Sequence, residues 1–172
     1  MLEIKVDQIK GGKARLQVYE NKIKIIETEA YIGKNGVTTN KVEGDGKTPL
    51  GTFKLGKIFG THDDVKNKEY TKVNPNLYWV DDAKSVYYNQ LIDIEKIKPD
   101  FNSAEYLVEY KQQYEYAVEI KTNEKNIPGK GSAIFLHCSV ERPTAGCVAI
   151  KSEIMKQIVE KIDENATICI EI

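Results

Sequence analysis

A period-two alternation of apolar and polar residues is the feature that most restricts how this chain can fold. It is clear in segments 13–19 and 22–32; in the first, Leu16 and Val18 alternate with polar residues. Because successive side chains of a β-strand point to opposite faces, this alternation predicts strands with one buried face. Glu20-Asn21 separates the two segments, so we expect a β-hairpin.

Further β-prone segments follow, separated by glycine, proline and polar residues. The stretch 33–51 is rich in glycine and is expected to be a loop. The predicted strands after it are Thr52–Phe59, Leu77–Val80, Tyr114–Lys121, Ala133–Cys138, Cys147–Ile150 and Ala166–Ile172.

Two helices are expected among these strands. Ser103 can cap a short helix that runs to about Tyr110, because its hydroxyl can accept a free N–H of the first turn. A longer helix should begin at Ser152, with Glu153 at the positive end of the helix dipole. Its apolar residues form one stripe at helical spacing: Ile154, Met155, Ile158, Val159 and Ile162. The chain should therefore be mainly β with two or three helices.

Length and charge exclude several classes of protein. A chain of 172 residues fits one domain over 1–172. Its net charge of −1 excludes a strongly basic nucleic-acid binder. No stretch approaches the roughly 20 apolar residues of a membrane-spanning helix. The first residues, with charges at positions 3, 5 and 7, do not form a signal peptide, which predicts a cytoplasmic protein if Met1 is the natural start.

The three cysteines are too few, and odd in number, for a disulfide framework. Cys138 shares a strand face with apolar residues and should be a small buried side chain, and we give Cys169 no role. Together with His62 and His137, the cysteines lack the paired spacing of a zinc site. We therefore predict no metal and no other cofactor.

One pair of residues has the chemistry of a catalytic site. His137 ends an apolar strand, and Cys147 begins the next β-prone run ten residues later. If the strands lie side by side, the imidazole can take the proton of the thiol. Gly146 allows close approach, so the N–H groups of Ala145, Gly146 and Cys147 can converge on an oxyanion. From these residues alone, a catalytic pair and two unrelated structural residues both remain open.

The region around this pair resembles the signature of the L,D-transpeptidase catalytic domain, also called the YkuD domain. It carries Phe-Leu-His-Cys, ending at Cys138, and Pro-Thr-Ala-Gly-Cys-Val-Ala, ending at Ala149. The segment Asp45-Gly-Lys-Thr-Pro-Leu-Gly-Thr-Phe53 is similar to the family's Thr-Pro-x-Gly-x-Phe stretch, and Trp79-Val-Asp-Asp82 adds to the likeness. The resemblance runs from about residue 10 to the end.

Two departures from the commoner family pattern stand out. Cys138 replaces the Gly or Ser that follows the first His, and Ala145 and Ala149 replace the His and Arg of Ser-His-Gly-Cys-x-Arg. The missing Arg removes a contact to a substrate carboxylate. Arg142, one of only two arginines, is our candidate to replace it.

The resemblance implies a fold and a chemistry. The fold would be a mixed β-sandwich or barrel with peripheral helices. Cys147 would attack the third residue of a peptidoglycan stem tetrapeptide and release D-Ala, with His137 as general base and then acid. The N–H groups of Gly146 and Ala145 would hold the oxyanion, and Arg142 and Thr144 would bind substrate. The list of side chains that could orient His137 is Asp45, Asp82 and Asn89, besides a backbone carbonyl.

The implied activity is a cysteine-dependent acyltransferase that makes 3→3 cross-links. Its partners would be peptidoglycan stem peptides, with carbapenem-type β-lactams as inhibitors, and its place would be the cell wall, outside the cytoplasm. Two alternatives use the same Cys-His pair: an L,D-carboxypeptidase and a cysteine hydrolase of another amide. A further alternative is an inactive peptidoglycan-binding module, which would bind muropeptides without using Cys147.

Overall fold

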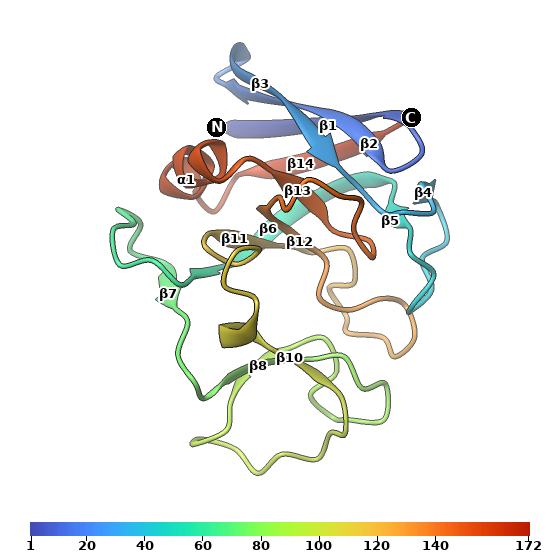
Figure 1. Ribbon diagram of the computed structural model, residues 1–172, viewed down its shortest axis with the longest axis vertical. Coiled ribbons are helices and arrows are strands. Elements are labelled where there is room, and N and C mark those ends of the chain that lie inside the picture. Colours follow the sequence, from blue (N-terminus) through green and yellow to red (C-terminus); the bar gives the residue numbers. More distant parts are fainter.

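A closed eight-stranded β-barrel dominates the computed structural model, which describes residues 1–172 (Figure 1). The strand order is β11-β12-β13-β3-β2-β1-β14-β6, and pairing of β6 with β11 closes the ring. Of the paired strands in the ring, β1 and β14 run parallel, as do β12 and β13, and all other neighbours are antiparallel. The strands of the barrel are β1 (Leu2–Lys10), β2 (Lys13–Glu20), β3 (Ile23–Tyr31), β6 (Gly51–Gly60), β11 (Ala117–Ile120), β12 (Phe135–Cys138), β13 (Val148–Ile150) and β14 (Thr167–Glu171).

Shorter elements extend one end of the barrel. A three-stranded antiparallel sheet of β8 (Leu77–Val80), β9 (Leu91–Asp93) and β10 (Ala104–Tyr106) lies below the barrel in Figure 1. β7 (Tyr70–Lys72) pairs with the end of β6, and the parallel pair β4 (Val37–Thr38) and β5 (Thr48–Pro49) interrupts the expected loop.

The expected hairpin is confirmed as β2 and β3, which pair from Lys13 with Tyr31 to Glu20 with Ile23. Its turn residues Asn21 and Lys22 have φ angles of 51° and 69°. Two consecutive positive φ angles give a turn whose twist matches that of the strands. β1 was missed at the sequence level, although its apolar residues at positions 2, 4 and 6 alternate with charged ones.

Two apolar clusters hold the molecule together. The larger fills the barrel and includes Leu16 and Leu136, and α1 (Ser152–Lys161) adds Met155, Ile158 and Val159 to it, as the predicted stripe requires. The smaller lies between the barrel and the β8–β9–β10 sheet, and four of its nine buried residues are aromatic. Its buried members are Phe59, Val73, Leu77, Trp79, Leu107, Tyr114, Ala117, Ala133 and Phe135.

The helix expected over Ser103–Tyr110 is wrong, and the structure has one α-helix instead of two or three. Residues Ala104–Tyr106 form β10, which pairs with β8, and only a 3-10 turn, Leu107–Glu109, follows. The hydroxyl of Ser103 donates a hydrogen bond of 2.5 Å to Asp81 instead of capping a helix. A long-range strand pairing thus overrides the local helix signal. None of the helices combines the length and apolar character needed to cross a membrane.

Candidate active site

The parallel ladder between β12 and β13 brings the predicted pair to one face of the sheet. Leu136 lies opposite Val148, and His137 lies opposite Ala149. By this register Cys147, the residue before β13, lies beside Phe135. Because side chains alternate along each strand, Cys147 and His137 are diagonal neighbours on the same face.

The opposite face of β12 points into the barrel. Ile134, Leu136 and Cys138 belong to the barrel core, and Cys138 is only 1% exposed. Burial raises the pKa of the Cys138 thiol to about 11. The prediction that Cys138 is a small buried side chain is therefore confirmed, and alternation separates it from Cys147.

A backbone carbonyl orients His137. The imidazole is buried, and its Nδ1 lies 2.8 Å from the carbonyl oxygen of Cys138. Since a carbonyl oxygen only accepts, Nδ1 carries the proton and Nε2 keeps a free lone pair. Burial lowers the pKa of His137 to about 4, so the ring is neutral at pH 7.

The side chains that were candidates to orient His137 bind elsewhere. Asp45 pairs with Lys41, and Asp82 accepts the backbone N–H groups of Lys84 and Asn102. Asn89 bonds to Trp79 and to the backbone near Cys147.

The thiol of Cys147 is also neutral and is held by backbone groups. Its Sγ donates to the carbonyl oxygen of Ala133 at 3.2 Å and accepts the N–H of Phe135 at 3.3 Å. Burial, and to a smaller extent the negative charge of Glu105, raise the pKa of Cys147 to about 12. No hydrogen bond joins Sγ to His137 in this arrangement, so the thiol must leave Ala133 before the imidazole can take its proton.

The turn that leads into Cys147 is fixed by two threonines. Thr144 Oγ1 donates to the carbonyl oxygen of Cys147 at 2.6 Å and accepts the N–H of Gly146 at 3.1 Å. Thr48 Oγ1 donates to the carbonyl oxygen of Gly146 at 2.8 Å. The N–H of Gly146 is therefore engaged within the turn, whereas those of Ala145 and Cys147 have no acceptor in the protein.

Only glycine fits at position 146. Its φ is 151°, and a Cβ atom there would lie 2.9 Å from the carbonyl oxygen of Lys47. Lys41, mostly buried in an ion pair with Asp45, donates from Nζ to the same Lys47 oxygen at 2.8 Å. The segment 41–48 thus forms a support beneath the turn. The Thr48-Pro49 motif at the end of this segment could be recognised in the sequence. The hydrogen bond from Thr48 to Gly146 could not.

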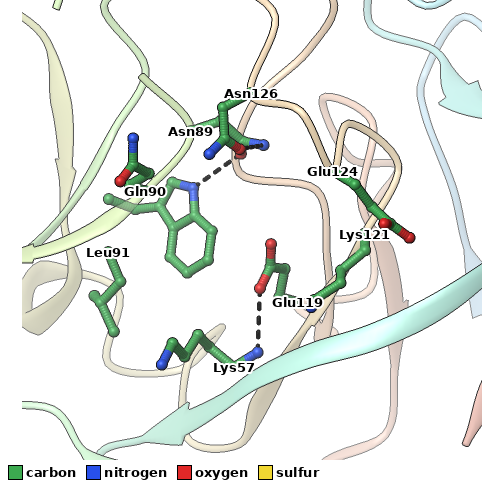
Figure 2. A pocket seen from close by; sticks show the side chains of 9 residues that line it. Lys57, Asn89, Gln90, Leu91, Glu119, Lys121, Glu124 and Asn126 are labelled. Atoms are coloured by element: carbon green, nitrogen blue, oxygen red, sulfur yellow. Dashed lines mark hydrogen bonds between the residues drawn. The ribbon is translucent and has the colours of Figure 1, made fainter. Parts of the chain in front are cut away.

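Asn89 supports the carbonyl that holds the thiol. Its Oδ1 accepts Trp79 Nε1 and the N–H of Ala133, both at 3.1 Å. Ala133 has a φ of 52°, a conformation that a non-glycine residue adopts only when its surroundings enforce it. Figure 2 shows Asn89 at one end of a cavity of about 290 Å³, which is also lined by Lys57, Gln90, Leu91 and Glu119. The cavity does not include Cys147 or His137.

Tyr114 and Glu105 belong to this site but were not found in the sequence. The buried ring of Tyr114 lies edge-on to His137, with ring centroids 5.7 Å apart, and its hydroxyl donates to Glu105 Oε2. Burial raises the pKa of Glu105 to about 7. No local sequence motif predicts that these residues lie near His137, because Glu105 is positioned by a long-range strand pairing.

The remaining candidate residues lie apart from these contacts. Arg142 is exposed in the loop between β12 and β13 and makes no side-chain hydrogen bond or ion pair. His62 stacks on Tyr116 with ring centroids 5.0 Å apart. No group of three residues is arranged to hold a metal ion.

The comparison with protein families now identifies the chain. The model of the L,D-transpeptidase catalytic domain (YkuD) matches residues 4–171. The chain belongs to the L,D-transpeptidase catalytic domain family. The resemblance seen around His137 and Cys147 is thereby confirmed over nearly the whole chain.

Solved structures match nearly the whole chain at low sequence identity. Pgp2 of Campylobacter jejuni, described as a helical cell shape determining protein, is 18% identical with a TM-score of 0.50, over 99% of this chain and 47% of that one. L,D-transpeptidase 1 of Mycobacterium tuberculosis is 13% identical, with a TM-score of 0.45, over 99% and 61%. An Enterococcus faecium L,D-transpeptidase is 12% identical, with a TM-score of 0.46, over 98% and 48%.

The chain therefore spans about half to three-fifths of the length of these structures. At these identities the likeness concerns the fold alone. No curated protein sequence matches the chain.

The burial of neutral His137 predicts a specific dependence of stability on pH. Its pKa is about 4 in the folded chain against 6.5 ordinarily, so between these values the unfolded chain binds the extra proton and stability falls as pH falls. Relative to His137→Gln, the wild type should lose about 3 kcal/mol of unfolding free energy between pH 7 and pH 4. Urea unfolding of both proteins across this range measures the difference. If the unfolding free energies of the two proteins changed equally with pH, the imidazole of His137 would not be buried in its neutral form.

Proposed function

We propose that this protein is a cysteine-dependent acyltransferase, an L,D-transpeptidase that acts on peptidoglycan stem peptides outside the cytoplasm. The observation that carries the proposal is the shared face of Cys147 and His137, with Nδ1 of the imidazole bound to a carbonyl. This leaves Nε2 as the proton acceptor for the thiol, which is the role that covalent catalysis by cysteine requires.

The pKa values favour proton transfer during attack over a preformed ion pair. With pKa values of about 12 for Cys147 and about 4 for His137, the proton stays on sulfur in the resting protein. Sγ gives its proton to Nε2 as it bonds to the carbonyl carbon of the third stem residue. The imidazolium then protonates the departing amine, and D-Ala leaves.

The turn before Cys147 supplies the groups that stabilise the intermediate. The N–H groups of Cys147 and Ala145 have no acceptor and serve as oxyanion donors. The N–H of Gly146 is bound to Thr144, and Gly146 contributes the backbone path that aims its neighbours. Thr144 acts through this turn, since its hydroxyl binds both Gly146 and Cys147.

The thioester at Cys147 is resolved by an amine of a neighbouring stem, which gives a 3→3 cross-link. Neutral His137 again takes the proton, now from the attacking amine. If water is the acceptor, the same site acts as an L,D-carboxypeptidase, so the acceptor decides between the two activities.

Release of D-Ala is the direct test of the donor half-reaction. We expect purified disaccharide-tetrapeptide to lose D-Ala with the wild type, and not with Cys147→Ala, as measured by mass spectrometry. Cys169→Ala serves as the matched control, because this thiol lies on β14, and it should keep full activity. Cross-linked dimers among the products indicate a transpeptidase, and tripeptide alone indicates a carboxypeptidase. Unchanged substrate would contradict the proposal.

Arg142 is proposed to bind a carboxylate of the stem peptide. It is exposed in the loop that leads from β12 to Cys147, and its side chain has no partner in the protein. Loss of a hydrogen bond to a charged group costs roughly 1.5–3 kcal/mol, so Arg142→Ala should raise KM about tenfold or more with little change in kcat. Arg15→Ala, which removes the other arginine, is the control. Equal kinetic constants in wild type and Arg142→Ala would exclude this role.

A further inference from the structure

Glu105 projects from the small sheet toward the catalytic strand. In the β8–β10 pairing it lies opposite Trp79, and residues directly opposite each other share a sheet face. Trp79 is buried with its ring centroid 4.8 Å from that of Phe135, a residue of β12. Glu105 therefore points to the same side, across from the strand that carries His137.

Tyr114 connects Glu105 to the surroundings of His137 and Cys147. Its hydroxyl donates to Oε2 of Glu105, while its ring lies edge-on to His137. The same ring contacts Phe135, with centroids 5.5 Å apart, and the N–H of Phe135 lies 3.3 Å from Sγ of Cys147. One aromatic ring thus separates the carboxyl group from the catalytic pair.

The other carboxyl oxygen of Glu105 is free to meet a ligand. Oε1 accepts no hydrogen bond from the protein, and no fully buried side-chain oxygen lacks a partner, so Oε1 is at least slightly exposed to solvent. No lysine, arginine or histidine forms an ion pair with Glu105. Lys41, whose charge lowers the pKa of Cys147, is already bound to Asp45.

The charges around Glu105 favour the arrival of a cation. Burial raises the pKa of Glu105 most, and the charges of Asp81 and Glu43 raise it further, against the hydrogen bond from Tyr114. Burial raises the pKa of Tyr110, a neighbour of this group, and the negative charge of Glu105 raises it further. A desolvated carboxylate without a counter-ion is stabilised by a hydrogen-bonded cation.

We propose that Glu105 forms a subsite for a primary ammonium group of the peptide that acylates Cys147. This inference rests on the proposed function, because the diamino acid at the third position of a stem peptide carries such a group. The ammonium donates to Oε1 while Tyr114 holds Oε2. Binding also cancels the negative charge beside Cys147, so the substrate lowers the pKa of the thiol that it is about to meet.

Binding to the inactive Cys147→Ala protein tests the subsite without turnover. The probes are a stem tetrapeptide with lysine at the third position and the same peptide acetylated on the lysine side chain. By isothermal titration calorimetry at pH 8, the free-amine peptide should bind about tenfold or more tightly than the acetylated one. Adding Glu105→Gln should abolish this preference, whereas Glu109→Gln, an exposed carboxylate in the following 3-10 turn, should preserve it.

A second measurement separates recognition from a purely structural role. In otherwise wild-type protein, Glu105→Gln removes a negative charge near the thiol, so alkylation of Cys147 by iodoacetamide, followed by peptide mapping, should become faster. Slower alkylation, a preference that survives Glu105→Gln, or no preference between the peptides would overturn the proposal. A preference that depends on Glu105, in a protein that releases no D-Ala, would support the subsite and refute the proposed function.

Discussion

The parallel pairing of β12 with β13 is the constraint on which the rest of the site depends. It fixes the register of His137 against Ala149 and so places Cys147 on the face that His137 occupies. The other face of β12 contributes to the barrel core, so neither strand can shift by one residue without exposing Leu136. The stability of the barrel and the position of the proposed catalytic pair are thus set by the same hydrogen bonds.

Burial on both faces also sets the chemistry of the pair. The second apolar cluster, with Trp79 and Tyr114, covers the side of β12 that carries His137 and keeps both reacting groups neutral. Neutral groups need polar partners that do not depend on charge, and backbone carbonyls of Cys138 and Ala133 fill that need. The β8–β9–β10 sheet, which packs over this side of β12, also carries Glu105. The same sheet therefore shields the site from solvent and places a carboxyl group near it.

The sequence predicted what depends on local periodicity and missed what depends on distant pairing. Alternation separated Cys138 from His137, and a helical stripe located α1. β10 was mistaken for a helix because it pairs with β8, more than twenty residues earlier in the sequence. Glu105 lies on β10, so its place near the site was missed for the same reason. The contact between Thr48 and Gly146 joins residues 98 positions apart. Family resemblance pointed to the Thr-Pro segment, but only the fold explains its contact.

We propose that the sheet register selects Cys147, and not Cys138 or Cys169, as the nucleophile. Acylation by a carbapenem distinguishes the three thiols, because the adduct adds a defined mass and peptide mapping assigns it to one cysteine. We expect a single adduct on Cys147, lost in Cys147→Ala and formed much more slowly in His137→Gln. An adduct on Cys138 or Cys169, or no adduct on the wild type, would contradict it.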